Sequence, residues 1–193
     1  MHTGVCGAPE TQPPLESSAL GVKMLQAAEW TAHPGTEMSL HHVSITTENL
    51  ERLADFYCGL LGFEIVLELE WEAGNAVPDA IYGLENTAVR MRLLRLKSAF
   101  LELFEFRSPK GVRPEGLPMV NTPGYTHLCL RVTDIDAEYA RLVAAGVRFN
   151  CPPQTMRGYC RATYARDPDG NLIELIEPVP GSVFDPDTPR RPS

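Results

Sequence analysis

The sequence predicts an α+β fold made of two consecutive βαβββ modules. Three observations support this prediction. One order of strand-like and helix-like segments occurs twice, each copy ends in a hairpin, and a segment rich in proline and glycine at 108–124 separates the copies. An internal repeat of this length is a strong architectural signal, because each copy is marginal as an independent fold. The modules are expected at about 38–107 and 125–178, together forming one domain over 38–178.

The first module begins with alternating apolar and polar residues at 40–46, as in a half-buried strand. Asn49 then stands where a helix cap is expected, and apolar residues follow it at helical spacing. The apolar segment 63–71 is expected to be the second strand. Lys-Ser at 97–98 is expected to join two further strands in a hairpin.

The second module repeats this order, with a strand at 126–132, a helix at 135–145 and a short strand at 147–150. Its hairpin is expected at 160–166 and 172–177, around an Asp-Pro-Asp-Gly sequence in which proline presets a turn.

The ends of the chain read differently. Residues 1–37 and 179–193 hold 8 of the 17 prolines. The first segment is expected to be an N-terminal extension with a short helix around 15–30, and the second an extended or disordered C-terminal tail.

Composition excludes several functions. The net charge of -8 argues against nucleic acid as a partner, since phosphate binding needs a basic surface. No apolar run reaches the 18 residues of a membrane span. The five cysteines lack CxxC spacing and suit reduced thiols, so a cytoplasmic protein that acts on small molecules is expected.

Two histidines and two glutamates recur at equivalent positions of the modules. His42 and His127 stand near the start of each first strand, and Glu102 and Glu174 lie on apolar faces of each last strand. A carboxylate on such a face needs a partner. If the repeats pack about a pseudo-twofold axis, the four side chains converge as ligands of one divalent transition metal.

Ordinary roles compete with this interpretation. A single strand histidine is more often a core or surface residue than a ligand, and only the recurrence of all four positions favours a metal site. Glu105 and Glu177 lie three residues beyond their counterparts on the opposite face and are expected to be solvated. His41 is expected to point away from His42 into solvent.

Several motifs resemble the vicinal oxygen chelate superfamily, which includes glyoxalase I, methylmalonyl-CoA epimerase, extradiol dioxygenases, and proteins of fosfomycin and bleomycin resistance. They are His42-Val-Ser-Ile, Asp55-Phe-Tyr-Cys-Gly-Leu-Leu-Gly-Phe63, Phe100-Leu-Glu-Leu, Gly124-Tyr-Thr-His-Leu-Cys-Leu130 and Asp167-Pro-Asp-Gly-Asn-Leu-Ile-Glu-Leu175. The resemblance implies a glyoxalase-like fold, in which eight strands form an open metal-binding cup. By position, it implies that His42, Glu102, His127 and Glu174 hold one Ni, Zn, Co, Mn or Fe ion.

The resemblance implies a metal-dependent isomerase or lyase of the glyoxalase I or epimerase type. Such an enzyme moves a proton next to a metal-polarised carbonyl, in a substrate of the carbonyl or thioester class. Glu174 is the expected principal base, and Glu102 the expected ligand or second acid/base.

Two alternatives remain open. An extradiol dioxygenase with non-haem iron would use Tyr164, ten residues before Glu174, as its acid/base, although dioxygenases of this family usually leave the site of Glu102 without a ligand. A protein that sequesters a small molecule without turnover is the other alternative.

Alternation adds candidates for the substrate pocket. Ser44, Cys129 and Arg131 share faces with the histidines, and Tyr164 completes the candidate set. Arg131 suits a substrate carboxylate or phosphate, although such an arginine more often pairs with an acid at the rim. The segments 72–87 and 157–160 are candidate lids. A homodimer is expected, and the sequence leaves open whether one chain or two form each cup.

Overall fold

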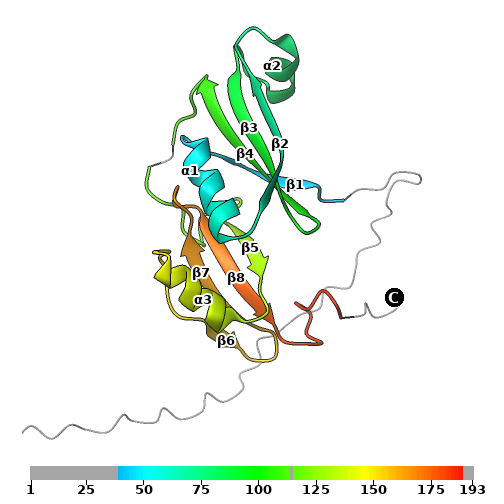
Figure 1. Cartoon of the computed structure of the whole chain (residues 1–193), viewed down its shortest axis with the longest axis vertical. Helices are drawn as coiled ribbons and strands as arrows, with labels where there is room; N and C mark the ends of the chain where they lie inside the picture. Colours follow the sequence, from blue (N-terminus) through cyan, green and yellow to red (C-terminus); the bar gives the residue numbers. More distant parts are fainter. Residues whose placement is uncertain (1–38, 114, 189–193) are drawn as a thin grey trace, which may run out of the picture. The chain divides into compact units, whose positions relative to one another are not determined.

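The computed structural model describes residues 39–113 and 115–188, which form two four-stranded mixed sheets (Figure 1). Sheet A has the order β1-β4-β3-β2 and consists of β1 (His42–Thr46), β2 (Glu64–Trp71), β3 (Ala88–Leu96) and β4 (Ala99–Ser108). Sheet B has the order β5-β8-β7-β6 and consists of β5 (His127–Arg131), β6 (Gln154–Met156), β7 (Cys160–Arg166) and β8 (Leu172–Pro178). In each sheet the first strand runs parallel to the last, and the other pairs are antiparallel.

Three α-helices accompany the sheets. Helix α1 (Leu50–Asp55) starts where the Asn49 side chain accepts a hydrogen bond from the Arg52 backbone, and it continues into a π-helical turn, Phe56–Leu60. Helix α3 (Ile135–Ala144) has the equivalent cap in Asp134. Helix α2 (Ala76–Tyr82) lies in the segment between β2 and β3. None of the helices in the described residues is long and apolar enough to cross a membrane.

The predicted α+β fold of two βαβββ modules is confirmed, with one strand displaced. The strand expected at 147–150 is absent, and only Phe149 forms an isolated bridge there. The reason is local: Gly146 takes a positive φ of 88° after α3, and the Val147 backbone donates back to Leu142. The second strand of the module, β6, therefore forms later, after two prolines that lack N–H donors.

The predictions for the two ends of the chain have different outcomes. The helix expected at 15–30 lies outside the described residues. The expected extended tail begins instead with hydrogen-bonded turns over residues 179–188.

Both modules contribute to one hydrophobic core beside α1. Leu50 and Leu53 of α1 pack with Leu101 of sheet A, and Ile173 of sheet B belongs to the same buried cluster. Burying a leucine of this kind contributes about 2 kcal/mol. This shared core therefore uses the sheet faces opposite to those that carry the repeated His and Glu positions.

Polar contacts also join the modules. The buried Tyr57 hydroxyl donates to Asp167 over 3.2 Å, and Arg52 pairs with Asp169 in the same turn. Arg141 of α3 donates to the Leu60 carbonyl over 2.6 Å. The contacts of Tyr57 and Arg52 connect α1 and the π-helical turn after it to the turn between β7 and β8, and the contact of Arg141 connects Leu60 to α3.

Candidate metal-binding and catalytic site

We call the side of sheet A that faces away from α1 its site face. Register partners in neighbouring strands share a face, and this assigns the residues directly. By register, the site face of sheet A carries His42, Ser44, Thr46, Phe100, Glu102, Phe104, Phe106, Val89, Met91, Leu93, Arg95, Leu67, Leu69 and Trp71. Most of these side chains are apolar, and the polar ones are His42, Ser44, Thr46, Arg95 and Glu102.

A compact polar group lies within this apolar face. The Nε2 atom of His42 is 3.3 Å from Glu102 Oε2, and the Ser44 hydroxyl donates to the same oxygen over 2.5 Å. Ser44 and Glu102 are register partners in the parallel pair of β1 and β4. The Glu102 side chain is only 15% exposed, so these contacts supply the partners that its burial requires.

His41 differs from the expectation that it points away from His42. Its Nδ1 lies 2.8 Å from His42 Nδ1, and its ring stacks on Phe100 at a centroid distance of 5.1 Å. The stacking explains the difference, because the Phe100 ring gives His41 an apolar surface beside the pair.

Sheet B carries an equivalent group of polar side chains. We call the face of sheet B that carries His127 and Glu174 its site face. His127 Nε2 is 3.1 Å from Glu174 Oε2, and Glu174 is again only 15% exposed. Cys129 is the register partner of Glu174 in β5, and Tyr164 is its partner in β7. The Tyr164 ring lies edge to face with His127 at 5.2 Å. The predicted neighbourhood of Cys129, Tyr164 and Glu174 is therefore present.

Burial changes the acidity of the residues around Glu174. Together with the negative charge of Glu174, it raises the pKa of Tyr164 to about 12 and that of Cys129 to about 12. Both side chains are therefore neutral at physiological pH. His127 also has a polar neighbour at its other ring nitrogen, since Thr126 Oγ1 lies 2.8 Å from Nδ1. Such a contact fixes the orientation of an imidazole.

The four expected metal ligands form two pairs within one chain. Each sheet brings its own histidine and glutamate together, but across residues 39–113 and 115–188 no three His, Cys, Asp or Glu side chains form a group that could hold a metal ion. The donor chemistry of each pair suits a divalent transition metal, with one imidazole nitrogen and one carboxylate. Each pair therefore supplies half of the expected ligand set.

The segment between β2 and β3 places an aromatic lid over sheet A. Tyr82 of α2 stacks on Trp71 at 6.0 Å and contacts the rings of Phe104 and Phe106. Burial and the negative charge of Glu102 raise the pKa of Tyr82. The sequence locates a candidate lid here but does not predict its helix.

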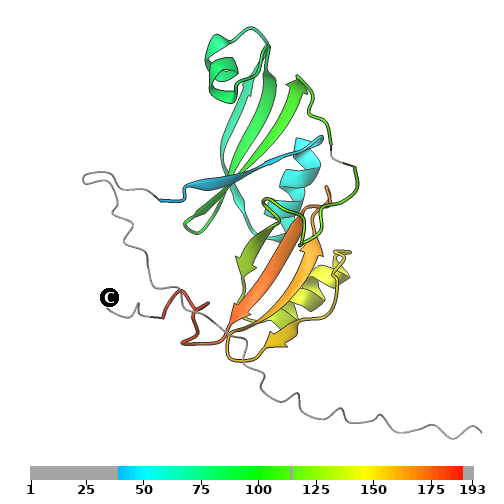
Figure 2. The ribbon, with the colours of Figure 1, turned by 180° about the vertical axis from the view of Figure 1, so that it is seen from behind.

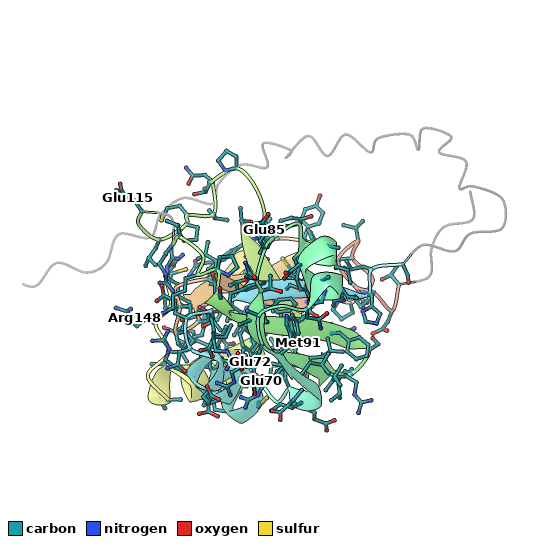
Figure 3. All side chains as sticks on the ribbon, turned by 90° about the horizontal axis from the view of Figure 1, so that it is seen from above. Glu70, Glu72, Glu85, Met91, Glu115 and Arg148 are labelled. Carbon is teal, nitrogen blue, oxygen red and sulfur yellow. The ribbon has the colours of Figure 1, made fainter. Side chains whose placement is uncertain are left out.

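The basic residues of β3 form a paired outer surface. Arg90 binds Glu51 and Glu105, and Arg92 donates to Glu68 over 2.6 Å. Arg107 of β4 likewise holds Glu70 and Glu72 at the end of β2, both labelled in Figure 3. These arginines are therefore paired with acids of α1, of neighbouring strands and of the segment after β2.

Two further acids differ from their expected solvated state. Glu105 accepts a hydrogen bond from the Leu50 backbone at the start of α1, and its side chain is 21% exposed. Glu177 lies 3.7 Å from Arg161. Their register places them on the helix-bearing faces, where partners are available.

A cavity in the described residues lies away from both pairs. It has a volume of about 740 Å³ and lies between the ends of β1 and β4 and the linker, with Thr46, Arg107 and Leu117 in its wall. None of the four expected ligands lines it.

Known proteins resemble the chain over this same region. The uncharacterized protein YaeR of Escherichia coli is 30% identical over 141 residues, which are 72% of this chain and 95% of that protein. The mitochondrial methylmalonyl-CoA epimerase of Dictyostelium discoideum is 27% identical, over 72% of this chain and 77% of the epimerase. The lactoylglutathione lyase of Pseudomonas aeruginosa is 25% identical, over 73% and 83%.

The fold matches solved structures as well. The crystal structure of a glyoxalase family protein from Bacillus cereus aligns with a TM-score of 0.69 and 23% identity, over 77% of this chain and 99% of that one. The model of the Glyoxalase/Bleomycin resistance protein/Dioxygenase superfamily matches residues 39–175, which include both His–Glu pairs. The chain therefore belongs to the Glyoxalase/Bleomycin resistance protein/Dioxygenase superfamily.

Proposed function

We propose that this protein is a metal-dependent isomerase or lyase whose sites are each completed by two copies of the chain. The observation that carries the proposal is the matched geometry of the pairs His42–Glu102 and His127–Glu174, at 3.3 and 3.1 Å. Each pair joins the first and last strand of its module at equivalent register positions. One pair from each of two chains would provide two imidazoles and two carboxylates.

The packing of the modules supports a site shared between chains. Within one chain, the core that both modules share uses the helix-bearing faces of both sheets. On the site face of sheet A, Tyr82 of α2 packs on the buried cluster that contains Phe104, and we infer that the rest of this face is available to another partner. The site face of sheet A exposes Leu67 and Leu69 by 42% and 46% at the β2 edge. An apolar face of this kind gains stability when another sheet covers it. A second copy offers both the covering surface and the missing ligands.

The donor set determines the chemistry that we propose. A divalent ion held by these four side chains would act as a Lewis acid on a substrate carbonyl oxygen. Glu174 would take the proton from the adjacent carbon and return it to the same or the neighbouring carbon. Tyr164 and Cys129 flank Glu174 in neutral form and would hold its carboxylate in position. The similarity to a methylmalonyl-CoA epimerase and a lactoylglutathione lyase supports this class of reaction.

Subunit complementation tests the shared site. One variant carries His42→Ala with Glu102→Ala, and the other carries His127→Ala with Glu174→Ala. Neither variant alone should bind a transition metal tightly. After dissociation and random reassociation in equal amounts, about one quarter of the wild-type metal content should return, because each mixed dimer regains one of its two sites. If each chain forms its own site, mixing restores nothing and the shared site is wrong.

The reaction class needs a separate test. Purified protein loaded with Ni²⁺, Zn²⁺, Co²⁺ or Mn²⁺ is incubated in D₂O with hemithioacetals of 2-oxoaldehydes and with branched acyl thioesters. Deuterium should enter the carbon next to the carbonyl, and Glu174→Gln should abolish this exchange while the metal content is measured in parallel. Metal binding without any exchange across the panel would contradict the isomerase or lyase assignment.

One observation favours a second candidate, a ring-cleaving dioxygenase. Tyr164 pairs directly with Glu174 and contacts His127, where a neutral tyrosine can donate a proton. With Fe²⁺ bound, this function predicts oxygen uptake in the presence of catechols, and Tyr164→Phe should suppress it. The lyase or isomerase predicts no oxygen consumption under the same conditions.

A further inference from the structure

The site face of sheet B extends beyond the metal pair to Arg131, the last residue of β5. Arg131 lies four residues beyond His127 on the same face, which separates their Cα atoms by about 13 Å. It pairs in register with Ile176 of β8, two residues beyond Glu174. The Arg131 side chain is 45% exposed, so its guanidinium is open to solvent.

Arg131 differs from the other arginine of the same face in its partner. Arg166 stands at the opposite end of the sheet, where it donates to the Gly170 and Pro118 carbonyls. Because these carbonyls belong to the backbone of loops, a ligand cannot easily displace them from Arg166. Arg131 instead donates to the Asp187 carboxylate over 2.8 Å, and Asp187 is 74% exposed.

The segment that carries Asp187 follows β8 directly and turns back at the end of that strand (Figure 2). Because β5 and β8 are parallel, this is also the end of β5 that carries Arg131. The segment is fastened to Tyr159, whose carbonyl accepts hydrogen bonds from the Val179 backbone and the Ser182 hydroxyl. Asp187 therefore lies in a short segment, residues 179–188, which we call the C-terminal strap and which hydrogen bonds anchor to Tyr159.

The strap also holds Asp187 in a defined turn. Asp185 accepts hydrogen bonds from the Gly181 and Asp187 backbones, and these bonds lower the pKa of Asp185. The turn leaves the Asp187 carboxylate free to reach Arg131. A guanidinium binds carboxylate and phosphate in the same bidentate geometry, so a ligand with either group can take this place.

We propose that Arg131 binds a second, anionic group of the substrate, a carboxylate or a phosphate, and that Asp187 occupies this position until the substrate displaces it. The proposal rests on the proposed function of the His–Glu pairs. The separation along β5 requires a substrate long enough to reach from the metal-facing carbonyl to Arg131, which excludes the smallest carbonyl compounds. Exposed ion pairs are weak, so the exchange of Asp187 for a substrate anion costs little.

Anion binding to the metal-free protein tests this inference apart from catalysis. The full chain is titrated in EDTA with inorganic phosphate and, separately, with acetate, and the backbone amide signals of β5 and of residues 185–188 are followed by ¹⁵N NMR. Asp187→Asn should tighten binding at Arg131 by roughly two- to fivefold, the range of strengths of exposed ion pairs. Arg131→Gln should abolish the response, alone or combined with Asp187→Asn. The anion that binds more tightly, phosphate or acetate, identifies the class of group that the site prefers.

A second ion pair on the other face of sheet B provides the matched control. Arg161 binds Asp136 through two hydrogen bonds of 2.6 and 2.8 Å, with similar exposure. Asp136→Asn should leave anion binding at Arg131 unchanged. Equal tightening by Asp136→Asn, or no tightening by Asp187→Asn, would overturn the proposal. Failure of the mixed variants to regain metal in the complementation experiment would contradict the proposed shared site but would not alter this titration.

Discussion

The Ser44 hydroxyl donates a hydrogen bond of 2.5 Å to Glu102, and the two residues are register partners in the β1–β4 pair. Parallel pairing of the first and last strand thus places a donor beside the carboxylate that we propose as a ligand. Sheet B has Cys129 at the equivalent position beside Glu174. The modules therefore share a design in which a small polar side chain supports the glutamate.

Replacing Ser44 with alanine should weaken metal binding, because Glu102 would lose the contact that orients it. Removing a group that hydrogen-bonds a metal ligand lowers metal affinity by about tenfold or more. We therefore expect the affinity for Zn²⁺, measured by calorimetric titration, to fall by about tenfold. Thr46→Ala is the control, since Thr46 lies on the same face of β1 but pairs with Phe104. An affinity equal to that of the Thr46→Ala protein would show that Ser44 does not support the ligand.

The bond between Tyr57 and Asp167 should matter for stability. Tyr57 is fully buried, and its hydroxyl connects α1 to the β7–β8 turn over 3.2 Å. Burial raises the pKa of Tyr57, so the hydroxyl remains a neutral donor. Tyr57→Phe should lower the free energy of unfolding by about 1.5 kcal/mol in urea, the contribution of a hydrogen bond to a charged partner.

Tyr125→Phe provides the comparison for this measurement, because Tyr125 is fully exposed. It should leave the urea midpoint unchanged. Equal midpoints for Tyr57→Phe and the wild type would mean that the hydrogen bond adds no net stability.

The lid formed by α2 should loosen in acid. Asp79 accepts hydrogen bonds from the Thr87 hydroxyl and backbone and from the Asn86 backbone, which hold its pKa below the ordinary value of 3.8. A carboxylate with a lowered pKa in the folded state stabilises the fold above its ordinary value, and this contribution is lost as pH falls. The contact between α2 and sheet A should therefore weaken below about pH 3.8.

Trp71 reports on this lid, since it stacks on Tyr82 and donates to Thr87. In a Trp30→Phe background it is the remaining tryptophan of the chain. Its emission should shift to the red as the pH falls below 4, and Asp79→Asn should show the shifted emission already at neutral pH. Asp185→Asn removes a carboxylate with a similarly lowered pKa from the C-terminal strap and should leave the Trp71 transition in place. A transition that persists in Asp79→Asn would have another origin.

Local patterns were sufficient to predict most of the strands and their faces, because alternation and the βαβββ repeat determine which side chains are neighbours. The sequence predicted that all four His and Glu side chains converge, whereas one chain brings them together as two separate pairs. The arrangement of the modules was not predictable in this way. It depends on contacts such as those of Leu53 and Ile173, which come from distant parts of the chain and share no local motif. The strand β6 was misplaced because the Val147 backbone N–H donates to Leu142 in the turn after α3 and so is not available to a strand. The periodicity of the sequence does not reveal this hydrogen bond.

Glu105 illustrates the same limit and gives the last prediction. Alternation correctly placed Glu105 on the face opposite Glu102. Its role, however, depends on α1, because the Leu50 backbone N–H at the start of that helix donates to the Glu105 carboxylate over 3.1 Å. A negative charge at a helix N-terminus stabilises the helix by up to about 1 kcal/mol and more where it is partly buried. Glu105→Gln should therefore lower the free energy of unfolding by about 1 kcal/mol. Glu177→Gln is the matched control, because Glu177 has the same repeat position but pairs with Arg161. Thermal unfolding should separate the two variants, and equal midpoints would mean that the charge of Glu105 does not stabilise α1.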